Sequence, residues 1–129
     1  MMTKKPGAAN MKPRPGRLRI VAGKWRSRLL DIADVPGLRP TSERVRETLF
    51  NWLAPSIQGA RCLDLFAGTG ALGFEALSRG AATVVFVDNS PRAIKAIETS
   101  AKTLNATGAI IHRTDAEDHA QQGQRRAHA

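Results

Sequence analysis

Hydrophobic and polar positions in the middle of the chain alternate between a strand pattern and a helix pattern. An apolar run at 62–67 leads into a glycine turn and then into apolar residues at helical spacing over 71–77. A β-branched run at 82–87 is followed by an amphipathic pattern at 91–104, and 109–113 is a short third run. Strands that alternate with helices are typical of a parallel sheet, so the pattern predicts an α/β fold that ends after its third strand.

A small basic hairpin is predicted before this α/β unit. Period-two alternation over 17–22, a turn at 22–24 and a return segment at 25–30 carry the prediction. Trp25 either packs against the core or stacks on a base. Core packing is the preferred interpretation, because large aromatic side chains are usually buried.

An amphipathic helix is predicted over 42–54, with Thr41 as its N-terminal cap. Apolar side chains at helical spacing predict the face that packs on the core, formed by Val45, Leu49, Trp52 and Leu53. Polar side chains fall on the other side, namely Arg44, Thr48 and Asn51.

The polar side of this helix, with Arg39 and Arg46 nearby, could hold a phosphate, a substrate base or a cofactor carboxylate. Guanidinium groups pair with such anions in a bidentate manner. The alternative is a solvated helix in which Glu43 or Glu47 neutralises Arg46.

The glycine turn after the first strand is a candidate binding site. Gly68 and Gly70 permit a sharp turn and a close approach of ligand to backbone. Their spacing with Gly73 also matches the fingerprint of NAD- and FAD-binding proteins. Asp64 argues against that reading, because a carboxylate would repel the pyrophosphate. An acid suits S-adenosylmethionine, which lacks phosphate and carries a cationic amino group, and a turn that serves packing alone is the other alternative.

Two further acids lie at predicted strand ends. Asp88 is placed to bind a ribose diol, since Ser90 followed by Pro91 is the better N-terminal cap for the next helix. Asp115 could reach an adenine amino group or could be an exposed loop carboxylate. The predicted cofactor contacts are Asp64, Phe66, Gly68, Gly70, Asp88, Asn89, Asp115 and Ala116.

The glycine turn and the acids that follow it resemble the first three motifs of class I S-adenosylmethionine-dependent methyltransferases. The blocks at 19–29 and 38–53 are similar to RsmD-type methyltransferases, which modify guanine N2 in 16S ribosomal RNA. The resemblance spans residues 18–116. It implies a Rossmann-like class I fold, S-adenosylmethionine as cofactor, and 16S rRNA or the 30S subunit as substrate.

Positive charge is concentrated at the start of the chain. The first 28 residues hold nine Lys or Arg and no acid, so the net charge of +9 arises there. Such a segment favours nucleic acid through phosphate contacts. The predicted RNA contacts are Arg17, Arg19, Lys24, Arg26, Arg28, Arg39, Arg44 and Arg46. The expected division is a disordered basic arm at 1–16, the hairpin and helix at 17–54, the cofactor-binding half at 55–116 and a polar tail at 117–129.

The segment at 117–129 contains no Val, Ile, Leu, Met or aromatic residue, so it cannot bury a face against a sheet. It departs from the family at the point where further strands are expected. A truncated or frameshifted reading frame would produce such a segment. The family's motif of Asn or Asp followed by two prolines and an aromatic residue, which holds the target amine, has no match, because no two prolines are adjacent. Catalytic residues are therefore unassigned and weak or no activity is expected. The alternatives are a catalytically inactive RNA-binding fragment and an NAD-binding oxidoreductase.

The remaining composition sets the environment. A single cysteine, Cys62, excludes an intrachain disulfide and predicts a reducing cytoplasm. No apolar run reaches the length of a membrane span, and the three histidines have no metal-ligand spacing. The small core and the open edge of the third strand predict poor stability or oligomerisation through that edge.

Overall fold

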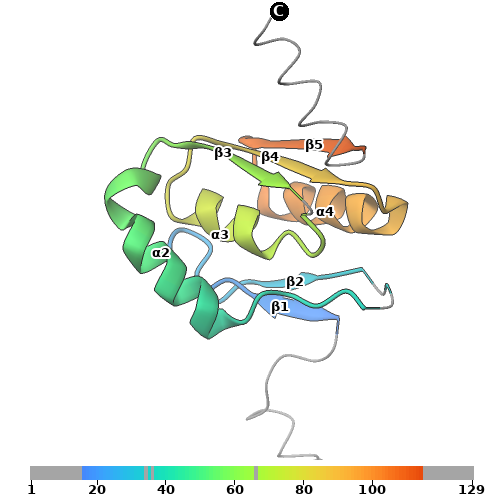
Figure 1. Cartoon of the computed structure of the whole chain (residues 1–129), viewed down its shortest axis with the longest axis horizontal. Helices are drawn as coiled ribbons and strands as arrows, with labels where there is room; N and C mark the ends of the chain where they lie inside the picture. The colour runs from blue at the N-terminus through green and yellow to red at the C-terminus, as the bar shows by residue number, and fades with distance from the viewer. Residues whose placement is uncertain (1–15, 34, 36, 66, 115–129) are drawn as a thin grey trace, which may run out of the picture.

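The computed structural model describes residues 16–114 apart from 34, 36 and 66 (Figure 1). The predicted basic arm and polar tail therefore lie outside the described residues, except for Gly16. The elements, in chain order, are β1 (Arg17–Arg19), β2 (Leu29–Asp31), α2 (Glu43–Ile57), β3 (Arg61–Leu65), α3 (Ala71–Ser78), β4 (Thr83–Asp88), α4 (Pro91–Leu104) and β5 (Ala109–Arg113).

The central sheet is parallel and has the order β3-β4-β5, which confirms the predicted α/β fold. Its register places Leu63 beside Val85 and Val85 beside Ile110. Helices α3 and α4 lie on the same face of the sheet (Figure 1), where Phe86 is buried. Leu63, by contrast, is 52% exposed. Among the described strands β5 is an edge of this sheet, as expected for the third strand, and β3 is the other edge.

The hairpin formed by β1 and β2 is antiparallel and shorter than predicted. Leu18 faces Leu30 in the register, and both are buried. In the segment that connects the two strands, the Ile20 carbonyl accepts from the Ser27 amide and the Ile20 amide donates to the Arg28 carbonyl. These two hydrogen bonds hold the connecting segment together beyond the last paired residues of β1 and β2. The side chain of Trp25 is buried, so the preferred interpretation of core packing is confirmed.

Helix α2 turns a different face inward from the one predicted. Trp52 is 78% exposed and Val45 is also exposed, while Arg46, Phe50 and Ile57 are buried. The predicted apolar face is therefore wrong except at Leu49, which is partly buried and packs against the core. Apolar spacing identifies a buried face only if charged side chains stay outside, and here Arg46 is buried because it is paired with an acid on α3.

Two details at the ends of α2 also differ from the predictions. Its N-terminal cap is Ser42, whose hydroxyl accepts from the Val45 amide at 3.2 Å, and not Thr41. The helix continues to Ile57, beyond the division expected at residue 54.

Side chains of the hairpin and of the parallel sheet share one hydrophobic core, to which both Leu18 and Phe86 belong.

Candidate functional site

The glycine turn between β3 and α3 has the conformation that its sequence predicts. Gly68 and Gly70 have φ angles of 56° and 80°, in the region that favours glycine. A Cβ on Gly70 would also lie 2.8 Å from the Phe74 ring, and one on Gly73 would overlap the Phe86 ring. Glycine at 73 therefore permits α3 to pack closely on β4, which is the packing role of the third glycine in nucleotide-binding turns.

Asp64 lies near the end of β3 with its side chain beside the start of α3. Its Oδ2 accepts from the Gly73 amide at 3.2 Å. The pKa of Asp64 is raised to about 6, chiefly by burial and to a smaller extent by the nearby charge of Asp88, while the Gly73 hydrogen bond opposes the shift. A cation bound beside this carboxyl group would stabilise its ionised form, which burial disfavours.

Asp88, at the end of β4, organises the same turn. Its Oδ2 accepts from the Gly68 amide at 2.8 Å and its Oδ1 from the Ser90 amide at 2.8 Å. Ser90 is the N-terminal cap of α4, as predicted, with its hydroxyl accepting from the Ala93 amide at 3.2 Å. The carboxylate thus joins two neighbouring strand ends.

The predicted cofactor residues gather at the carboxyl ends of the parallel strands. Asp64, Gly68 and Asp88 are brought together there, and Asn89 is exposed next to them. These strand ends form the rim of the sheet. The end of β5 reaches the same rim, because the Thr114 amide donates to the Asp88 carbonyl at 2.9 Å. Phe66, Asp115 and Ala116 lie outside the described residues.

The chemistry of this rim favours a cationic, hydroxyl-rich ligand over a pyrophosphate. Two carboxylates, Asp64 and Asp88, border the turn, and the Gly68 amide already donates to one of them. Pyrophosphate recognition needs free backbone N–H groups and no nearby anion. Each carboxylate oxygen keeps acceptor capacity after one hydrogen bond, so hydroxyl donors can still bind.

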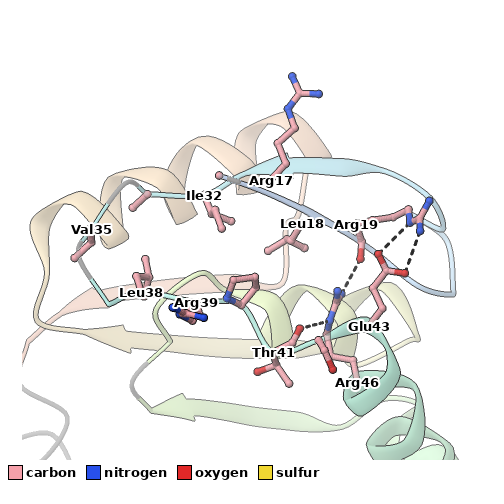
Figure 2. Close-up of a pocket in the computed structure, with 14 residues that line it drawn as sticks. Arg17, Leu18, Arg19, Ile32, Val35, Leu38, Arg39, Thr41, Glu43 and Arg46 are labelled. Carbon is pink, nitrogen blue, oxygen red and sulfur yellow. Dashed lines mark hydrogen bonds and ion pairs between the residues drawn. The ribbon is translucent and has the colours of Figure 1, made fainter. Parts of the chain in front are cut away.

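A second feature is a basic groove of about 1260 Å³ between the hairpin and the segment that leads into α2 (Figure 2). Four of the arginines predicted to contact RNA line it, namely Arg17, Arg19, Arg39 and Arg46. Arg17 pairs with Asp31 at 3.2 Å, and Arg19 forms two hydrogen bonds with Glu43, each at 3.2 Å. These exposed pairs are weak, so a phosphate can compete for both arginines.

Arg46 borders this groove, but its side chain is enclosed and not exposed as predicted. It is 1% exposed, and its Nη1 donates to Glu75 Oε1 at 3.0 Å and to the Arg19 carbonyl at 2.8 Å. Burial lowers the pKa of Arg46, and the charge of Glu75 opposes this. The prediction that Arg46 contacts RNA is corrected on this geometry, because its guanidinium is enclosed. The proposed neutralising partners were also wrong, since the ion pair is with Glu75.

Sequence reasoning missed Glu75. It is fully buried, yet its carboxylate accepts four hydrogen bonds, from the amides of Val21 and Ala22 and from Arg46 and Arg79. The one available signal was an acid within the otherwise apolar helix at 71–78. That signal predicts a partner without identifying it.

The other predicted RNA contacts do not line the groove. Arg26, Arg28 and Arg44 are exposed, and the Lys24 ammonium lies 4.7 Å from the centre of the Trp25 ring. Within the described part of the chain, no group of His, Cys, Asp and Glu could hold a metal ion. None of the described helices combines the length and the apolar character needed to cross a membrane.

Comparison with solved structures places this fold in a known class. A structure of the Escherichia coli protein yhhF is 48% identical and has a TM-score of 0.75 over 81% of this chain and 56% of that chain. A Trypanosoma brucei PRMT1 complex with AdoHcy is 28% identical, with a TM-score of 0.52 over 61% of this chain and 24% of that chain. The parallel sheet with its helices is that of the class I methyltransferase fold.

The family described as Conserved hypothetical protein 95 matches residues 18–129, and the chain belongs to this family. Its curated relatives are RsmD-type methyltransferases. It is 50% identical over 101 residues to ribosomal RNA small subunit methyltransferase D of Escherichia coli, covering 78% of this chain and 51% of that protein. The protein of the same name from Haemophilus influenzae is 49% identical over 92 residues, covering 71% and 48%. The chain thus spans about half the length of the curated relatives it matches.

Proposed function

We propose that this chain takes part in the S-adenosylmethionine-dependent methylation of a guanine N2 in 16S ribosomal RNA. The observation that carries the proposal is the pair of acids at the glycine turn, one of them with a pKa of about 6. Family membership supports the reaction class, and the names of the relatives support ribosomal RNA of the small subunit as the substrate.

The rim residues fit S-adenosylmethionine better than a dinucleotide. When bound, this cofactor supplies the methyl group that the exocyclic amine takes in line, so the protein mainly positions the two reactants. Asp64 would pair with its cationic amino group, and Asp88 would accept hydrogen bonds from its ribose hydroxyls. AdoHcy, bound in one structural neighbour, is the same compound without the methyl group.

The basic groove supports an RNA partner. Arg17, Arg19 and Arg39 line it, and the guanidinium group matches phosphate geometry in a bidentate manner. Phosphate contacts of this kind give affinity without sequence choice. The choice of guanine N2 rests on the resemblance of the upstream blocks, because the residues that would hold the target amine are not assigned in this chain.

The direct test is methyl transfer to undermethylated 30S particles, with S-adenosylmethionine labelled in its methyl group. The Escherichia coli relative is the positive control, and Asp64→Asn is the matched negative control. We expect label on a guanine N2 of 16S rRNA, at a rate well below that of the relative. A folded chain that binds the particles and transfers no label would show an RNA-binding fragment instead. Label on another base would refute the guanine specificity.

A further inference from the structure

The hairpin is attached to α3 through the backbone of its turn. The amides of Val21 and Ala22 each donate to the Glu75 carboxylate at 3.0 Å. Three residues further along the helix, Ser78 Oγ accepts from the Trp25 amide at 3.0 Å and donates to the Ala22 carbonyl at 2.6 Å. Glu75 and Ser78 lie on the same face of α3, so the turn follows that face.

Glycine at position 23 permits this close approach. Its φ is 90°, and a Cβ there would overlap the backbone carbonyl and the hydroxyl of Ser78. The Lys24 amide donates to the same Ser78 carbonyl at 2.9 Å. The hairpin turn and α3 are therefore fitted to each other at the level of the backbone.

Glu75 also connects α3 to the basic groove. Its carboxylate holds the buried Arg46, whose Nη1 donates to the Arg19 carbonyl at 2.8 Å and whose Nε donates to the Thr41 carbonyl at 3.1 Å. Figure 2 shows Arg46 between these two walls of the groove. One side chain on α3 thus fixes the strand that carries Arg19 and the segment that leads into α2.

The same helix begins at the cofactor turn, because Gly70 is its N-terminal cap. A helix rises about 1.5 Å per residue, so Glu75 lies less than two turns from that cap on a rigid element. We infer that Glu75 is a positioning residue, which fixes the arginine-lined groove relative to the methyl-donor site at the start of α3. This inference rests on the proposed function for the ligands that it assigns to the two sites.

The experiment compares Gly23→Ala and Glu75→Gln with a matched control, Gly59→Ala. Gly59 has a similar φ of 76° but open space around its Cβ, so the control introduces the backbone strain without the overlap. Gly23→Ala keeps the Glu75 carboxylate and both rim acids in the sequence, which keeps the test valid if Glu75→Gln does not fold. Amide hydrogen exchange is measured first, followed by the affinities for S-adenosylmethionine and for a 16S rRNA fragment.

In Gly23→Ala we expect amides at 17–31 to lose protection while those of β4 keep theirs. RNA affinity should fall by about tenfold, with the cofactor affinity within about twofold of the control. Parallel loss of protection in the hairpin and the sheet, or equal loss of both affinities, would overturn the inference and indicate a purely structural role. Unchanged hairpin protection would also overturn it. If the unaltered chain binds no RNA while the exchange result holds, the proposed RNA partner fails and the attachment by Glu75 stands.

Discussion

Replacing Asp64 by asparagine should stabilise the folded chain at neutral pH. The amide has the same shape and can still accept from the Gly73 amide, but it carries no charge into the partly buried site. Burial raises the pKa of Asp64 from 3.8 to about 6, which corresponds to a cost on the order of 3 kcal/mol for holding the ionised form in the folded state. Removing this cost, less the cost of burying the amide, should raise the free energy of unfolding by about 1 to 3 kcal/mol.

The sign of the pH dependence follows from the raised pKa. Between about pH 4 and pH 6 the folded state keeps a proton that the unfolded state releases, so this group lowers stability as the pH rises through that window. Above about pH 6 the effect is constant, and below about pH 4 it vanishes. The difference between Asp64→Asn and the unaltered chain should therefore be largest at about pH 8 and near zero at about pH 4.

Urea denaturation at several pH values measures this difference, and other titrating groups cancel between the two proteins. Asp31→Asn is the control, because it makes the same substitution at an exposed carboxylate in a surface ion pair. A variant that is less stable at about pH 8, or a difference that does not shrink toward about pH 4, would refute the reasoning.

Three further predictions concern the turn, the helix cap and the groove. Gly73→Ala should lower the free energy of unfolding by about 1 to 3 kcal/mol in urea denaturation, because the new Cβ overlaps the Phe86 ring, and an unchanged value would contradict the packing role. Ser42→Ala should cost about 1 kcal/mol in the same measurement and Thr41→Ala distinctly less, whereas the reverse order would restore the cap predicted from sequence. Arg39→Ala should weaken RNA binding and reduce the slope of log K against the logarithm of the salt concentration by about one, as measured by fluorescence anisotropy. An unchanged slope would show that Arg39 makes no phosphate contact.

The parts of the fold that the sequence predicts are those set by local signals. The β-branched run of β4 and the Ser90-Pro91 start of α4 need no partner to be recognised, and both lie where they were expected. The glycine turn was recognised for the same reason. Its packing role was only an alternative at that stage, because the Phe86 ring that excludes a Cβ at position 73 belongs to another element.

The parts that the sequence does not predict depend on distant partners. The buried face of α2 was misassigned because the burial of Arg46 depends on Glu75, which lies 29 residues away. Ser42 was missed as a cap because both Thr41 and Ser42 have a suitable hydroxyl, and only the backbone geometry separates them. Asp88 was expected to bind a ligand, while its hydrogen bond to the Gly68 amide, across two strands, became visible only in the fold.

We propose that the acid-lined turn binds S-adenosylmethionine, and calorimetric titration at about pH 8 tests this binding. We expect saturable one-to-one binding of S-adenosylmethionine, affinity reduced by about tenfold or more in Asp64→Asn, and no binding of NAD. Saturable binding of NAD without binding of S-adenosylmethionine would contradict the claim, and so would equal affinity of the variant and the unaltered chain for S-adenosylmethionine.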